Sequence, residues 1–310
     1  MVLSEYLIYL LLGFLCSVLL VGFVLSLKTA LTEKFSLDEF LHKLALPLAG
    51  EIPSVEHLAK TTPAANSFTV QNALAETYLG VAKRLPMLQQ GGKPQVLVVT
   101  SLKMGEGCST VAANLGNSYA KLGAKVLLID ANARRPQIHR LFNLSNQWGL
   151  THYLAGACQL SKVTQRHGTD THTLYVISAG DPARDSMQML SGRAMRQLVE
   201  SARQHFDVTI IDSPSVNEET DALILASLAN ATLIVSSIRP WQHKHLTAAL
   251  DQLERITPNI VGVLKMDAKQ GALEDYYEQQ QREALKRANA RGGGLNLLRH
   301  HAAKLPKLKR

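Results

Sequence analysis

The chain has 310 residues, of which 46% are hydrophobic and 19% are charged, so it can bury a core and global disorder is excluded. Its formal charge is +8, but residues 282–310 hold nine Lys/Arg and one acidic residue, so the rest of the chain is nearly neutral. The net charge therefore gives little support for a nucleic-acid partner. Three cysteines, Cys16, Cys108 and Cys158, show neither metal-ligand spacing nor a disulfide framework, which is compatible with a reducing compartment.

The N-terminal residues 6–27 form an apolar run of 22 positions without a formal charge, which is long enough to cross a bilayer as a helix. Lys28 and Lys34 follow the run, and the positive-inside rule then places residues 1–5 outside and the bulk of the chain in the cytoplasm. We therefore expect a single-pass protein of the inner membrane. Small residues such as Gly13 and Ser17 inside this run could allow two copies to associate as a homo-oligomer.

The remaining chain predicts a connector followed by one large α/β unit. Residues 28–68 predict a cytoplasmic juxtamembrane linker with a helix at 36–46, which the proline- and glycine-containing stretch PLAGEIP (47–53) ends before the next helical segment. Continuous apolar strands alternating with helices then favour a mostly parallel sheet flanked by helices over residues 69–268, with a polar and basic tail at 269–310. The predicted strands are 95–101, 125–135, 173–180, 206–215, 231–240 and 259–267, and the predicted helices include 73–88, 109–123, 187–204 and 242–256.

Polar residues follow the ends of three of these strands, where ligands bind in parallel sheets. The loop at Gly105 and Gly107 would let backbone N–H groups converge on an anion at a helix N-terminus, and Ser109 is placed to bind Mg²⁺ through its hydroxyl. Asp130 could orient water around Mg²⁺, and Asp212 has the context of a Walker-B carboxylate. A structural turn or a capping residue is the alternative for each feature alone, but the three in order favour a nucleotide site.

The same segments carry a family resemblance. "TSLKMGEGCSTVAANLGNSYAKLGAKVLLIDANARRPQIHRLF" (100–142) resembles the Walker A and A′ region of the bacterial tyrosine autokinases of capsule and exopolysaccharide assembly, relatives of the ParA/MinD ATPases. "FDVTIIDSPSVNEETDALILA" (206–226) follows in that family's order. The resemblance implies a P-loop NTPase fold of the deviant Walker A type, ATP and Mg²⁺ as cofactors, and polysaccharide co-polymerase or export machinery of the inner membrane as partners.

The resemblance also implies roles for individual residues. The catalytic group would comprise Asp130, Asp212 and Lys103, and the metal would be held by Ser109, Asp130 and Asp212. The nucleotide would be bound by Gly105, Glu106, Gly107, Cys108, Ser109, Thr110, Arg134 and Lys265.

Several positions depart from the family pattern. Cys108 stands at the position of the P-loop lysine, Asn132 replaces the second acid of the A′ motif, and Lys265 stands where relatives usually carry an asparagine near the adenine. Glu76 of a family oligomerisation motif is kept, whereas Leu79 and Ala82 replace its two arginines. The family's C-terminal tyrosine cluster is missing; only Tyr276 and Tyr277 remain, as phosphoacceptors or simply as part of a polar helix face.

These departures leave three functions open. A regulatory or scaffolding pseudokinase rests on Cys108 and Asn132. A residual ATPase or kinase rests on the retained aspartates and on Lys103, which occupies the position of the signature lysine of ParA/MinD relatives. A MinD-like membrane switch draws on Lys103 and on the basic tail, which could bind anionic lipids or simply remain a solubilising segment.

Overall fold

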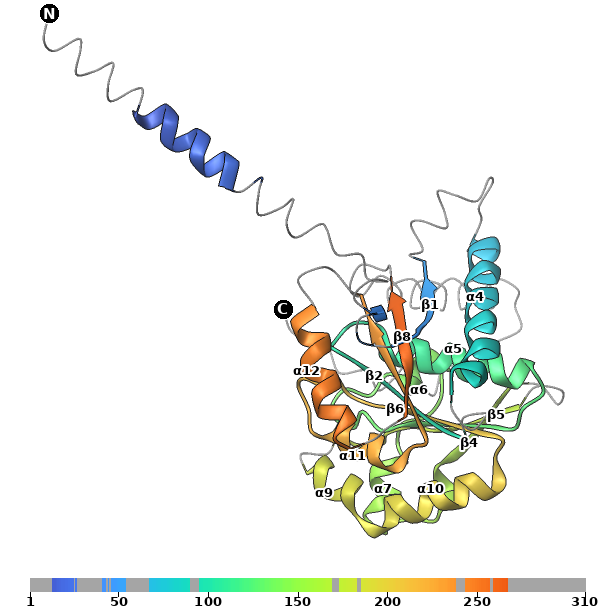
Figure 1. The fold of residues 1–310 in the computed structure, drawn as a ribbon. Helices are drawn as coiled ribbons and strands as arrows, with labels where there is room; N and C mark the ends of the chain where they lie inside the picture. The colour runs from blue at the N-terminus through green and yellow to red at the C-terminus, as the bar shows by residue number, and fades with distance from the viewer. Residues whose placement is uncertain are drawn as a thin grey trace, which may run out of the picture.

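The computed structural model describes residues 13–24, 26, 41–42, 44, 46–53, 67–89, 95–168, 173–182, 185–237, 243–256 and 259–266. Its strands and helices alternate along most of the chain (Figure 1). The strands are β1 (Leu48–Ile52), β2 (Val96–Ser101), β3 (Val126–Asp130), β4 (Thr164–Gly168), β5 (Thr173–Ile177), β6 (Val208–Asp212), β7 (Ala231–Ser236) and β8 (Ile260–Met266). The helices are α4 (Ser67–Leu88), α5 (Cys108–Lys121), α6 (Ile138–Leu141), α7 (Leu150–Leu154), α8 (Leu160–Val163), α9 (Ser186–Ser191), α10 (Arg193–His205), α11 (Asp221–Leu228) and α12 (His243–Glu254).

The described strands form one eight-stranded sheet in the order β1-β8-β7-β2-β6-β3-β5-β4. Every pair in it is parallel except β4 with β5, which confirms the predicted α/β class with a mostly parallel sheet. The topology places β2, β6 and β3 side by side, so the three polar strand ends identified in the sequence meet at one edge of the sheet.

Helices cover the sheet on both faces, which explains why the central strands are apolar without alternation. In β2, Leu97 and Val99 pack into a core shared with α4 and α5, whereas Val96 and Val98 face a second core shared with α7 and α10. A third cluster joins α11 and α12 to β7 and β8. All six residues of β2 are buried, so the loop that follows this strand starts from a rigid base.

The predicted strands correspond to β2, β3, β5, β6, β7 and β8, but the helices differ in detail. The helix predicted at 187–204 is two helices, α9 and α10, because Gly192 between them is extended (ψ 168°). The helix predicted at 36–46 is described only in part, and of its described residues 41–42 are helical. The N–H groups of Leu44 and Leu46 both donate to the carbonyl oxygen of Leu41 and so form turns. The chain then enters β1 through Pro47, which stops a helix.

Two edge strands were not predicted from the sequence. β1 pairs in parallel with β8, so the sheet draws one strand from the segment that we predict as a linker at 28–68. Pro47, Gly50 and Pro53 make this stretch resemble a break, yet an edge strand tolerates such residues because one side needs no partner. β4 has the polar sequence TQRHG and pairs antiparallel with β5 at the opposite edge.

Replacing Gly262 with alanine is expected to destabilise the domain by roughly 2–4 kcal/mol. Gly262 has φ 141°, and a Cβ atom there would lie 2.5 Å from the carbonyl oxygen of Pro47, which accepts the N–H of Val263. Chemical denaturation measures the loss, and hydrogen exchange should show that β1 opens first. Gly80→Ala is the control, because it adds a methyl group to open space on α4 and should be neutral or stabilising. Equal stability of the two variants would contradict this role of Gly262.

The predicted membrane span at 6–27 lies only partly within the described residues, as a helix at 13–24 that continues at residue 26. In the described part of the chain, no helix combines the length and the hydropathy that crossing a membrane requires. The predicted tail at 269–310, with Tyr276 and Tyr277, lies outside the described residues.

Candidate functional site

The loop between β2 and α5 has the geometry expected from its glycines. Gly105 (φ 80°) and Gly107 (φ 84°) both adopt left-handed conformations that favour glycine. Gly107 also lies close to Met266 of β8, since a Cβ atom on it would be 3.4 Å from the Met266 Cε atom. Helix α5 begins directly afterwards at Cys108, so the loop presents backbone N–H groups at a helix N-terminus, as an anion site requires.

Glu106 does not line the pocket next to this loop, although we predicted that it binds the nucleotide. Its side chain is turned into the protein and the residue is 7% exposed. One carboxylate oxygen accepts the N–H groups of Leu102 (3.0 Å) and Lys103 (2.9 Å). The other accepts hydroxyl groups of Ser236 and Ser237 at 3.3 Å. Glu106 therefore fixes the loop to the end of β7 and acts as a structural brace.

Asp130 and Asp212 end the neighbouring strands β3 and β6 and are partners in the strand register. Both are fully buried. The carboxylate of Asp130 accepts three backbone N–H groups, from Asn132, Gln137 and Ile138, at 3.1–3.2 Å. Burial, followed by the charge of Asp212, raises the pKa of Asp130, and the three N–H groups oppose the rise. The negative charge of Asp212 therefore repels a negative charge on the Asp130 carboxylate.

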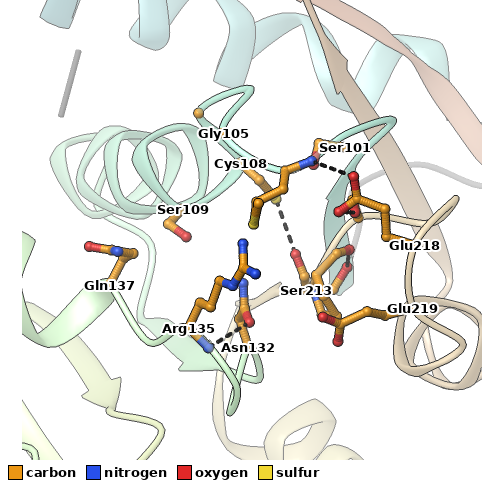
Figure 2. Close-up of a pocket in the computed structure, with 14 residues that line it drawn as sticks. Ser101, Gly105, Cys108, Ser109, Asn132, Arg135, Gln137, Ser213, Glu218 and Glu219 are labelled. Carbon is orange, nitrogen blue, oxygen red and sulfur yellow. Dashed lines mark hydrogen bonds between the residues drawn. The ribbon is translucent and has the colours of Figure 1, made fainter. Parts of the chain in front are cut away.

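Cys108 occupies the position at which a P-loop carries its lysine, and its thiol is turned into the protein. The Sγ atom lies 3.1 Å from the carbonyl oxygen of Val99 and 3.3 Å from Asp212 Oδ1. It also lies 3.4 Å from the carbonyl oxygen of Ser213 (Figure 2). Burial raises the pKa of the thiol well above its ordinary value, and the charge of Asp212 raises it further. Cys108 is therefore a neutral donor to the strand ends and supplies no positive charge.

A pocket of about 390 Å³ lies beside the loop, between the segments that follow β3 and β6 (Figure 2). Of the predicted site residues, Gly105, Gly107, Cys108 and Ser109 line it. The other lining residues are Ser101, Met104, Asn132, Arg135, Gln137, Ser213, Pro214, Ser215, Glu218 and Glu219.

Three other residues predicted for the nucleotide site do not line this pocket. Thr110 is fully buried in α5. Arg134 lies 3.3 Å from a carboxylate oxygen of Glu219 and faces a second pocket of about 320 Å³. Lys265 forms a salt bridge of 2.6 Å with Glu51, because these residues are register partners on β8 and β1. Arg134 and Lys265 are thus committed to ion pairs that the sequence pattern did not reveal.

The proposed catalytic residue Lys103 is also absent from the pocket lining. The side chain of Arg135 points into the pocket instead, and its backbone N–H donates to Asn132 Oδ1 at 3.2 Å (Figure 2). Among the described residues that line the pocket, Arg135 alone is basic. The doubled arginine in "DANARRP" was the available signal, but it does not tell which of the two side chains faces the ligand.

The oxygen ligands present here fit a Mg²⁺ ion bound together with phosphate. Ser109 lines the pocket, whereas Asp130 and Asp212, the predicted metal ligands at the ends of β3 and β6, are fully buried and are not among its lining residues. Mg²⁺ is usually held by one or two carboxylates and by phosphate oxygens. No group of three or more His, Cys, Asp or Glu residues gathers for a metal in the described ranges. Strand, glycine loop, helix and two strand-end aspartates together have the arrangement of a P-loop fold.

Comparison with known proteins identifies the family to which this domain belongs. The family model described as AAA domain matches residues 94–266, and the chain belongs to that family. It is a homologue of bacterial tyrosine-protein kinases, as the sequence resemblance predicted. Tyrosine-protein kinase etk of Escherichia coli K12 is 32% identical over 169 residues, which are 54% of this chain and 23% of the relative. Tyrosine-protein kinase YwqD of Bacillus subtilis is 28% identical over 202 residues, 65% of this chain and 84% of the relative.

Solved structures show the same similarity. The kinase domain of Escherichia coli tyrosine kinase ETK matches with a TM-score of 0.66 and 27% identity, covering 76% of this chain and 96% of that domain. The chimerical protein CapA2B2 matches with a TM-score of 0.63 and 25% identity, covering 74% of this chain and 98% of that one. The chain thus spans about a quarter of the length of the Escherichia coli relative, in the region that corresponds to its kinase domain.

Proposed function

We propose that this chain is a membrane-anchored, tyrosine-kinase-like P-loop protein that regulates exopolysaccharide or capsule synthesis or export. In this proposal it is a weak or inactive kinase that acts as a regulatory partner of the co-polymerase and export machinery. The observation that carries the proposal is the buried thiol of Cys108, which faces Asp212 and Val99 at the position of the P-loop lysine.

The missing charge has a large expected effect on phosphate chemistry. A lysine at this position stabilises negative charge on the β- and γ-phosphates. At an effective dielectric constant of 20, a pair of unit charges 4 Å apart is worth about 4 kcal/mol. A neutral thiol cannot replace this interaction, and a thiolate would repel phosphate. Turnover should therefore fall by orders of magnitude, while the shape of the pocket is kept.

The residues that remain support nucleotide binding without efficient catalysis. Backbone N–H groups at Gly105 and Gly107 would hold phosphate, and Ser109 with the two aspartates would hold Mg²⁺. When bound, Mg²⁺ would neutralise phosphate charge. This chain's own contribution is a shaped loop, fixed by Glu106, next to a pocket of suitable size.

Anchoring in the inner membrane forms the second part of the proposal. Residues 13–24 are helical and every one of them is exposed, including large apolar side chains such as Phe14 (69%) and Leu20 (65%). Exposed apolar side chains on all sides of a helix are costly in water but are stabilised in a lipid bilayer. The tail at 269–310 would add contacts with anionic lipids, and small residues in the span could support a homo-oligomer.

The alternatives receive less support. An active kinase or ATPase that uses Lys103 within its own site would need this side chain at the phosphates, but Lys103 does not line the pocket of its own chain. A MinD-like membrane switch cycles on and off the membrane, which a permanent span would prevent.

Arg135→Ala is expected to weaken ATP–Mg²⁺ binding about tenfold, because it removes the basic side chain that lines the pocket. Lys103→Ala should change the affinity by less than about twofold, since Lys103 is not among the residues that line the pocket. Isothermal titration of the full chain measures both variants. A large loss in Lys103→Ala, with none in Arg135→Ala, would instead support the active enzyme with a relocated lysine.

Titration of the unmodified chain with ATP–Mg²⁺ tests the proposal itself. We expect saturable binding that is much weaker than in a P-loop with its lysine. Tight binding would contradict the loss of function at Cys108. Complete absence of binding, also after Cys108→Lys, would show that the pocket is not a nucleotide site.

A further inference from the structure

Glu218 lies in the segment between β6 and α11 and reaches back to the phosphate-binding loop. Its Oε1 atom accepts the backbone N–H of Met104 at 3.4 Å (Figure 2). Its Oε2 atom accepts the hydroxyl of Ser215 at 2.7 Å, and its own N–H donates to the carbonyl of Ser215. The carboxylate is therefore held at the edge of the pocket, next to the loop that would bind phosphate.

The charges around the pocket make this contact unfavourable for an anionic ligand. Two carboxylates, those of Glu218 and Glu219, line the pocket together with the single basic side chain of Arg135. Glu219 lies 3.3 Å from Arg134, which balances its charge. None of the salt bridges found among the described residues involves Glu218. Its negative charge is therefore the one that an incoming phosphate would meet.

We propose that Glu218 is an internal competitor for nucleotide phosphate, which sets the affinity of the P-loop pocket by placing a carboxylate on the loop. This inference rests on the proposed function, in which the pocket binds a nucleotide. Phosphate binding requires the Glu218 carboxylate to leave Met104, or to remain nearby and repel the ligand. Both alternatives weaken binding, and both add to the loss of positive charge at Cys108.

The position of Glu218 allows such a movement. The residue is exposed, so its side chain can turn into solvent without opening the core. The backbone around it is fixed by other contacts: the N–H of Glu219 donates to the carbonyl of Ser215, and the N–H of Val216 donates to that of Ser101. Removing the Glu218 charge should therefore change the ligand affinity without unfolding the segment.

Glu218→Gln tests the role of the charge, because glutamine has nearly the same shape, keeps one acceptor oxygen and can donate its amide N–H to the Ser215 hydroxyl oxygen. Titration of the full chain with ATP–Mg²⁺ and with inorganic pyrophosphate should show about fivefold tighter binding than in the unmodified chain. The gain should shrink as salt is added, since the charge is exposed. Glu200→Gln is the matched control: it removes one carboxylate from α10, far from the lining of the pocket, and should leave the affinity unchanged.

The same pair of measurements in a Cys108→Lys background separates this inference from the proposed function. If Cys108→Lys tightens binding and Glu218→Gln adds nothing in either background, the internal competitor is ruled out and the nucleotide site stands. If Glu218→Ala tightens binding while Glu218→Gln does not, the effect is steric and the role of the charge is refuted. If no variant binds ATP or pyrophosphate, both the proposed function and this inference are wrong.

Discussion

Replacing Cys108 with lysine is expected to tighten binding of ATP–Mg²⁺ by about two orders of magnitude. The change puts a positive charge at the start of α5, beside the Asp212 carboxylate that now lies 3.3 Å from the thiol. The new ammonium group would balance the buried aspartates and would face phosphate held by the loop. Isothermal titration of both proteins under the same conditions measures the gain.

Cys108→Met is the matched control for this change. Methionine has a length similar to that of lysine and fills the same space, but it carries no charge. We expect it to leave the affinity near that of the unmodified chain, or to lower it by crowding Val99 and Asp212. A gain in Cys108→Met equal to that in Cys108→Lys would mean that pocket shape, and not charge, limits binding.

Replacing Asp212 with asparagine is expected to stabilise the fold at neutral pH by about 1–3 kcal/mol, while weakening Mg²⁺-dependent binding. Asp130 and Asp212 are buried side by side at the ends of β3 and β6, and the pKa of Asp130 is raised by burial and by the charge of Asp212. Asparagine removes the repulsion and keeps an oxygen near Cys108. Chemical denaturation across a pH series measures the stability.

The pH dependence of this effect has a defined sign. Because the pKa of Asp130 is higher in the folded state than its ordinary value of 3.8, the folded state holds the proton more tightly than the unfolded state. Stability is therefore greatest below the unfolded pKa and falls as the pH rises through the folded pKa. In Asp212→Asn this fall should be smaller. Asp251→Asn, an exposed change on α12, is the control and should leave the curve unchanged. Identical curves for all three proteins would contradict the repulsion.

The central part of the fold was predictable because buried parallel strands leave a simple signal. β2, β3 and β6 are continuous apolar runs that end in polar residues, and their order in the sheet brings Asp130 and Asp212 together. The edge strands gave no such signal. β1 contains glycine and is bounded by prolines, and β4 is polar, because each has a neighbouring strand on one side only.

The site was predictable only as far as the backbone determines it. The loop between β2 and α5 needs residues that adopt left-handed conformations at positions 105 and 107, and the glycines there were readable in the sequence. Ser109 lines the pocket, and its role as a Mg²⁺ ligand stays a prediction. The directions of long side chains depend on partners distant in sequence. Glu106 turns to Ser236 and Lys265 turns to Glu51, and neither contact leaves a local pattern in the sequence.

Phosphoryl transfer to tyrosine is the measurement that tests the central claim most directly. The full chain, incubated with ATP–Mg²⁺, would be analysed for phosphotyrosine by mass spectrometry beside Asp212→Ala, which removes a carboxylate predicted to be essential for Mg²⁺. Since Cys108 supplies no charge at the phosphates, we expect the unmodified chain to show no more phosphotyrosine than Asp212→Ala. Abundant phosphotyrosine in the unmodified chain that disappears in Asp212→Ala would show an active kinase and would contradict the account.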